Sequence, residues 1–126
     1  RSCMKDVQTS YGYDLPLLNH ITRSTVPHKI NVGVLGLKSD QINWLQVQHW
    51  IGLLQKHQGT SYFQEQALVA MYLAEKEFDV LDPKEYQCID HSKILNHQTL
   101  VHFVAGSKKL YFQRAWKKYL RLLHEA

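Results

Sequence analysis

The segment formed by residues 62–76 limits the possible folds more than any other part of the chain, because it predicts a helix that is apolar on nearly every side. Its apolar residues are Phe63, Ala67, Leu68, Val69, Ala70, Met71, Leu73 and Ala74. Such a helix is stable in water only when other elements cover it all round. The chain has 126 residues, of which 44% are hydrophobic, and this length suffices to build that cover. We therefore expect one compact domain, or a piece of a larger one, around this helix.

The elements before this helix follow from periodicity and capping residues. Residues 29–37 (KINVGVLGL) alternate and are rich in β-branched side chains, which predicts a buried strand. Apolar residues at helical spacing predict a helix over residues 40–57, with Ser39 as N-cap and Gly59 as its end. Ser61 and Gln64 match the capping box that starts a helix. Residues 1–28 form a poorly defined lead-in with one short helical turn near residues 15–21.

Short strands and a basic helix are predicted after the apolar helix. Residues 99–105 (TLVHFVA) form the second convincing strand, and residues 78–81 and 86–89 are shorter extended segments. Ser107 is expected to cap a helix that ends near His124. The aromatic residues of this last helix fall on its apolar side, so we expect them to pack in the core.

The basic charge of the chain is local, because lysine or arginine occupies positions 108, 109, 114, 117, 118 and 121, while the net charge is only +4. Such a patch suits phosphates, acidic surfaces or nucleic acid. A small basic module that binds nucleic acid or protein without catalysis is therefore the alternative function.

Cysteine and histidine patterns argue against several kinds of site. The two cysteines, Cys3 and Cys88, form no CxxC pair, so we expect a reducing compartment and a cytoplasmic protein. His91, His97 and His102 are too irregularly spaced for a zinc motif, and no elbow glycines surround Cys88. No apolar run approaches the roughly 18 residues that a transmembrane helix needs.

Four segments resemble, in the same order, motifs of the glycogenin-like glycosyltransferases, a family with the GT-A fold. They are residues 31–36 (NVGVLG), 62–68 (YFQEQAL), 81–88 (LDPKEYQC) and 101–109 (VHFVAGSKK). These are similar to the N-x-G strand, the D/E-Q helix start, the LPPEYN segment and the HF-x-G-x-K segment of the family. The resemblance covers roughly residues 29–112 and departs from the family after Lys108, where the family often has Pro-Trp.

The resemblance implies a fold and a function. It implies an α/β fold, the C-terminal acceptor-side part of a GT-A domain, whose two main strands belong to one mixed sheet with flanking helices. Residues 1–126 would be a single domain fragment, with the acceptor-side part at residues 29–124. The enzyme would move a hexose from a nucleoside-diphosphate sugar to a hydroxyl of a glycan, lipid or protein. Nucleic acid is not an expected partner.

The resemblance also assigns roles to polar residues near the first strand and the apolar helix. Asn31 and Gly33 would face the acceptor and the transferred sugar, although a glycine there also suits a bulge or close packing. Glu65 is the expected catalytic carboxylate, binding sugar hydroxyls or serving as a base, and Gln66 would bind substrate beside it. Alternatively, Glu65 is only a helix-end charge, favoured by the helix dipole by about 0.3–1 kcal/mol.

The metal and diphosphate residues are expected in the last motif. His102 would bind Mn²⁺ or Mg²⁺, although a lone histidine in a strand is more often a core residue. Gly106, Lys108 and Lys109 would meet the diphosphate. The Asp-x-Asp pair that supplies oxygen ligands to the metal does not occur in the sequence. We therefore expect it upstream of Arg1, with the metal bound only in a longer enzyme and this fragment inactive, or else a degenerate relative.

Overall fold

The computed structural model describes residues 2–5, 11–89, 99–104 and 107–124. The chain divides into two compact units, residues 1–81 and residues 82–126. Small sheets and flanking helices alternate along the chain, which confirms the α/β class. Among the described residues, no helix is both long enough and apolar enough to cross a bilayer.

A three-stranded sheet forms one layer of the first unit. Its strand order is β2 (Ile30–Gly36), β1 (Ser2–Lys5), β3 (Asp79–Val80), with β1 antiparallel to β2 and parallel to β3. Strand β2 lies within the predicted residues 29–37, and β3 lies within the predicted segment 78–81. The lead-in therefore contributes the central strand of this sheet.

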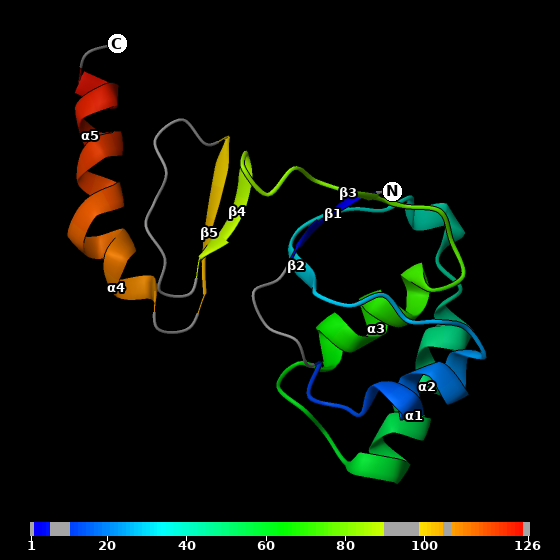
Figure 1. Ribbon diagram of the computed structural model, residues 1–126. Helices are drawn as coiled ribbons and strands as arrows, with labels where there is room; N and C mark the ends of the chain where they lie inside the picture. Colours follow the sequence, from blue (N-terminus) through cyan, green and yellow to red (C-terminus); the bar gives the residue numbers. More distant parts are fainter. Residues whose placement is uncertain (1, 6–10, 90–98, 105–106, 125–126) are drawn as a thin grey trace. The chain divides into compact units, whose positions relative to one another are not determined.

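Three helices pack in the first unit. They are α1 (Leu15–Thr22), α2 (Trp44–Gln58) and α3 (Gln64–Leu73), and a short 3-10 helix, η1 (Ser39–Gln41), precedes α2. Helix α3 lies beside β2 and contacts both α1 and α2 (Figure 1). Because α3 is apolar on nearly every side, it must be covered all round, and β2, α1 and α2 contribute this cover.

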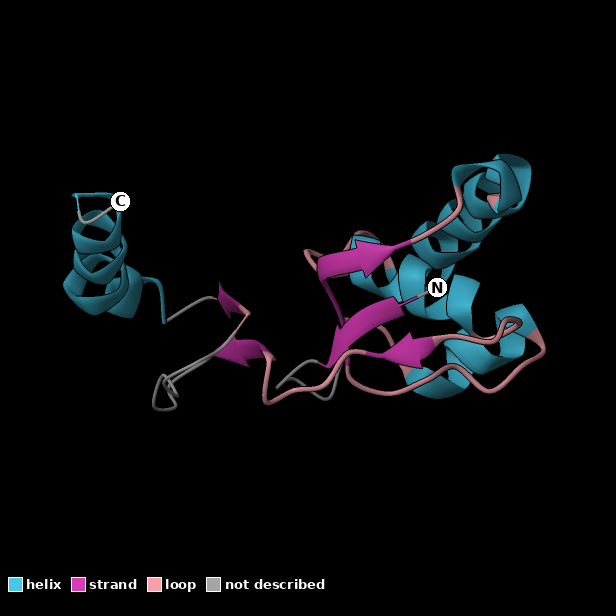
Figure 2. Cartoon of the chain, turned by 90° about the horizontal axis from the view of Figure 1, so that it is seen from above, coloured by secondary structure: helices cyan, strands magenta, loops and turns pink. Residues whose placement is uncertain are grey.

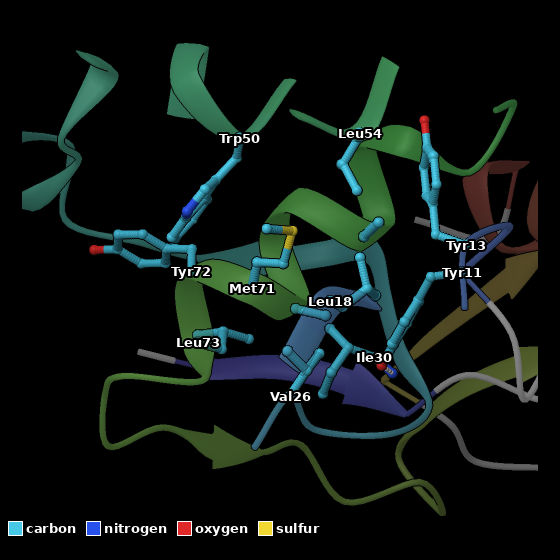
Figure 3. Packing of buried hydrophobic residues seen from close by; sticks show 12 residues of the cluster. Tyr11, Tyr13, Leu18, Val26, Ile30, Trp50, Leu54, Met71, Tyr72 and Leu73 are labelled. Carbon is cyan, nitrogen blue, oxygen red and sulfur yellow. Dashed lines mark hydrogen bonds between the residues drawn. The ribbon is translucent and has the colours of Figure 1, made fainter. Parts of the chain in front are cut away.

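The core of the first unit surrounds α3, as the sequence predicts. Within α3 the side chains of Ala67, Ala70, Met71, Tyr72 and Leu73 are buried. Figure 3 shows side chains of α1, α2 and β2 pointing toward Met71. The lead-in adds Tyr11, Tyr13, Leu18 and Val26 to this core. Residues 11–28 are thus an integral part of the domain, which the mixed composition of the lead-in did not reveal.

Two predicted helix starts are wrong by a few residues. Helix α2 is capped by Asn43, whose side chain accepts the N–H of Gln46 at 3.1 Å, instead of by Ser39. The Ser61 hydroxyl accepts the N–H of Phe63 at 3.2 Å, so the capping box does not form and α3 begins at Gln64. At α2 a second polar residue, Asn43, provides the cap, whereas at α3 the N-cap position is Phe63 and no side chain caps the helix. The predicted end of α2 at Gly59 is confirmed.

The second unit is built on two parallel strands. Strand β4 (Tyr86–Ile89) is at the predicted position and pairs with β5 (Leu100–Phe103), as Figure 2 shows. The prediction that the strands at residues 29–37 and 99–105 share one mixed sheet is wrong, because β2 and β5 belong to different sheets. Alternation identifies a strand, but it does not identify the edge with which that strand pairs.

A continuous helical stretch, residues 108–124, ends the described chain. It comprises α4 (Lys108–Leu110), a π-helical segment (Tyr111–Ala115) and α5 (Trp116–His124) (Figure 1). The expectation that its aromatic residues pack in the core is wrong for Tyr111, Phe112 and Trp116, whose side chains are exposed. No described element of the second unit is long enough to cover the whole apolar side of this helix.

Substitution by alanine should have opposite effects on the free energy of unfolding at two glycines of the first unit. Gly12 has φ +72°, and a Cβ atom there would lie 2.0 Å from the Ser61 Oγ. Gly12→Ala should therefore lower the free energy of unfolding by about 1–2 kcal/mol, the cost of a left-handed residue with a side chain. Gly52, inside α2, faces open space. Gly52→Ala should raise the free energy of unfolding by about 0.5–1 kcal/mol. Urea unfolding followed by Trp50 fluorescence measures both, and equal effects would contradict the structure.

Candidate functional site

A bulge interrupts strand β2 at the N-x-G motif. Residue Asn31 of β2 pairs with Met4 of β1, and the next pair is Leu35 with Cys3. Three residues of β2, including Gly33, therefore lie opposite a single step of β1. The Asn31 Oδ1 accepts the N–H of Gly33 at 2.7 Å, and Asn31 is buried. The side chain of Asn31 thus holds the bulge, which matches the structural role considered for Gly33.

The N-x-G strand and the E-Q helix start are joined directly. The buried Gln66 Nε2, in the first turn of α3, donates a hydrogen bond to the carbonyl oxygen of Ile30 at 2.6 Å. Ile30 immediately precedes Asn31 in β2. The strand that carries the N-x-G motif and the helix that carries the E-Q motif therefore meet in the fold, although Ile30 and Gln66 are 36 residues apart in the sequence.

Tyr11 holds the start of β2 from the other side, a role that sequence reasoning missed. Its hydroxyl accepts the N–H of Ile30 at 2.9 Å and donates to the carbonyl of Pro27 at 2.5 Å. Between these two contacts Lys29 adopts φ +58°, in the left-handed region. Tyr11 thus stabilises the turn at residues 27–30, which sets the direction in which β2 begins. No periodicity or motif points to Tyr11 in the sequence.

Glu65 and Gly33 are the exposed members of the predicted site in the first unit. Glu65 lies in the first turn of α3, next to the buried Gln66. An exposed carboxylate can accept hydrogen bonds from hydroxyl groups of a ligand. The anchored α3 start therefore presents one carboxylate to solvent from a fixed backbone, while Asn31 and Gln66 serve the packing beneath it.

The remaining predicted residues belong to the second unit. His102 is half-buried in β5 and pairs in register with the buried Cys88 of β4. Lys108 and Lys109 are exposed at the start of the last helix, and Gly106 lies outside the described residues. The convergence of Asn31, Glu65 and His102 on one face stays a prediction, because Asn31 and His102 lie in different units.

The described residues do not by themselves fit a divalent metal ion. Within residues 2–5, 11–89, 99–104 and 107–124, no three side chains of His, Cys, Asp or Glu gather closely enough to hold one. His91 and His97 lie outside this part of the chain. Since Mn²⁺ and Mg²⁺ need several oxygen or nitrogen ligands, metal binding by His102 stays a prediction for a longer enzyme.

Comparisons with protein-family models, with curated proteins and with solved structures give no match to this chain.

The bond between α3 and β2 predicts a stability effect that is specific to Gln66. In Gln66→Met the volume is kept, but the carbonyl of Ile30 loses its amide donor in a buried place. The free energy of unfolding should fall by about 1–3 kcal/mol, the cost of an unsatisfied buried polar group. Gln55→Met, at an exposed position of α2, should change it by less than about 0.5 kcal/mol. Urea unfolding measures both variants, and equal stability would remove Gln66 as the anchor.

Proposed function

We propose that this chain is the acceptor-side part of a GT-A-like glycosyltransferase, which moves a hexose from a nucleoside-diphosphate sugar to a hydroxyl acceptor. The observation that carries the proposal is the hydrogen bond from Gln66 to Ile30 at 2.6 Å. It joins the N-x-G strand to the E-Q helix start, the two segments that face the acceptor and the transferred sugar in the family that the chain resembles. Without that bond the two motifs would be independent short patterns.

The bulge in β2 supports the same proposal. Bulges occur more often than elsewhere next to active sites, where they redirect side chains and end strand pairing. Here the bulge lies at Gly33, which has no side chain and is exposed. A polyhydroxyl ligand can approach bare backbone at such a place, and the amide of Asn31 keeps that backbone in position.

Glu65 is the residue that we propose for the chemistry. Its carboxylate can bind sugar hydroxyls, or, in an inverting reaction, it can take the proton of the acceptor hydroxyl as that oxygen bonds to the sugar carbon and the bond from this carbon to the nucleoside diphosphate breaks. Either role requires a fixed position, since catalytic groups must be held within about 0.5 Å of the productive geometry. The hydrogen bond of the neighbouring Gln66 to Ile30 supports such a role, because it anchors the backbone at the start of α3. Gly106, Lys108, Lys109 and His102 are proposed for the diphosphate and the metal of a longer enzyme, and no reaction step is derived through them.

The first prediction for this function concerns donor binding. Because the sequence holds no Asp-x-Asp pair, the 126-residue chain should bind UDP- or GDP-sugars with a Kd of about 1 mM or weaker. Isothermal titration calorimetry with Mn²⁺ present measures this. Micromolar binding, or turnover of either donor by the isolated chain, would contradict the idea that donor recognition needs a further segment.

The second prediction concerns Glu65 in an enzyme that contains the whole transferase domain. Glu65→Gln keeps the shape but removes the charge and the basicity, so kcat should fall by about 100-fold or more. Glu75→Gln, an exposed residue just beyond α3, should keep wild-type turnover. The melting temperature of both variants is the control for folding. Wild-type kinetics in Glu65→Gln would reduce Glu65 to a helix-end charge.

A further inference from the structure

The last helical stretch exposes apolar side chains along one side. Tyr111, Phe112, Trp116 and Leu120 are 41%, 68%, 38% and 41% exposed. Three of them, Phe112, Trp116 and Leu120, follow at intervals of four residues and so lie along one stripe of a helix. Isolated exposed apolar residues are common on proteins, but a row of large ones marks an interaction surface. We call Phe112, Trp116 and Leu120 the apolar stripe.

A cationic stripe runs beside it. Lys117 and Arg121 are exposed and each follows one residue after a member of the apolar stripe, a rotation of about 100° around the helix. Residues 108–124 hold six lysine and arginine residues and no aspartate or glutamate. The helix is therefore amphipathic in a particular way, with large apolar side chains on one side and only positive charge on the polar side.

The first turns of this helix are attached to the strands of the second unit, and Phe112, Trp116 and Leu120 in the later turns are exposed. The Ser107 hydroxyl is buried and donates to the carbonyl of Ile89 at 2.5 Å. The rings of Phe103 and Tyr111 meet edge to face with centroids 5.6 Å apart. These contacts fix the base of the helix on β4 and β5, so the stripe beyond Tyr111 is presented to the surroundings.

We propose that the helix at residues 108–124 lies flat on the surface of an anionic lipid bilayer. The apolar stripe enters the boundary between headgroups and acyl chains, and the exposed Lys117 and Arg121 contact the lipid phosphates, as in interfacial amphipathic helices. This inference is independent of the proposed transferase function. The source of the phosphate is the bilayer, because free phosphate or a nucleotide would leave the apolar stripe in water.

The indole of Trp116 supports this occupant. Its Nε1 donates a hydrogen bond to the carbonyl of Phe112, within the helix itself. The polar group of the ring is therefore satisfied without water, which lowers the cost of moving the ring into an apolar phase. Tryptophan and tyrosine are also enriched at membrane interfaces because their rings are amphipathic.

The arrangement favours a bilayer over a nucleic acid. Proteins that bind single strands place aromatic rings among cations, so that bases stack while phosphates are neutralised. Lys108 lies four residues before Phe112, in line with the apolar stripe, but from residue 112 on the exposed aromatic and cationic side chains lie on separate stripes. Leu120 in the apolar stripe offers no stacking surface. Segregation of this kind matches the layered order of a bilayer surface, in which apolar chains lie below and charges above.

Vesicle binding tests the proposal with Trp116 as reporter. The 126-residue chain carrying Trp44→Phe retains the buried Trp50 and the exposed Trp116. Co-sedimentation with vesicles of phosphatidylcholine alone, and of phosphatidylcholine with phosphatidylglycerol, measures partitioning. We expect binding to the anionic vesicles, weakened by salt, with a blue shift of the Trp116 emission. Absence of binding, equal binding to both vesicles, or bound chain without a blue shift would overturn the proposal.

Paired variants separate charge from apolar insertion. Lys117→Gln with Arg121→Gln should weaken partitioning about 30-fold, from roughly 1 kcal/mol per cation near an anionic surface. The matched pair Lys38→Gln with Lys56→Gln, both exposed in the first unit, should leave it unchanged. Equal losses in the two pairs would reduce the interaction to net charge and contradict the proposal.

Phe112→Ser with Leu120→Ser should weaken partitioning about tenfold or more, since each apolar side chain contributes on burial, and should reduce the blue shift. Leu45→Ser, exposed on α2, is its control, and circular dichroism checks folding. If the serine variants lose helical structure, the comparison of Lys117→Gln with Arg121→Gln against its matched pair still tests the proposal. A single-stranded oligonucleotide that binds more tightly than anionic vesicles, through the same Lys117 and Arg121, would replace the bilayer by a nucleic acid.

Discussion

The first unit depends on how the backbone of Ile30 is held. Its N–H donates to the hydroxyl of Tyr11 and its carbonyl accepts from the amide of Gln66, at 2.9 and 2.6 Å. Both partners are side chains from other elements, the lead-in and α3. Each of these groups is buried, where loss of its partner costs about 1–3 kcal/mol. One residue of β2 therefore fixes the lead-in, the strand and the central helix relative to one another.

The candidate site follows from this constraint. Because β2 is held at Ile30, the bulge at the next residues does not displace the strand. Where the pairing with β1 is interrupted, the side-chain amide of Asn31 accepts the N–H of Gly33. A helix held at Gln66 keeps Glu65 at a fixed place on the surface. The buried Gln66 and the exposed Glu65 are thus adjacent in sequence, and the bond of Gln66 to Ile30 anchors the backbone from which Glu65 extends.

The second unit follows a different rule. Among its described residues, the buried apolar side chains are Cys88 and Ile89 in β4, and Phe112, Trp116 and Leu120 of the last helix are exposed. The first unit buries its most apolar helix, α3, whereas the second unit exposes apolar side chains of its last helix. This difference is consistent with the proposed site in the first unit and the proposed membrane surface in the second.

The sequence by itself determined where most elements lie. Strand-type sequences located β2 and β5, and residues 86–89 were expected to be extended. Helical periodicity located α2, a nearly all-apolar run located α3, and Gly59 ended α2, because these signals act within a few residues. It also determined that α3 is central, since a helix with no polar side has no other stable place. The E-Q helix start and the N-x-G strand were visible as candidates on the same grounds.

Only the tertiary structure decided which of these local options were used together. It joined Gln66 to Ile30, made Tyr11 part of the support and chose Asn43 over Ser39 as the cap of α2. It also assigned β2 and β5 to different sheets and left Trp116 outside the core. Hydrogen bonds between distant residues and the pairing of strand edges depend on which groups meet in space. The periodicity of a single segment carries no record of its neighbours.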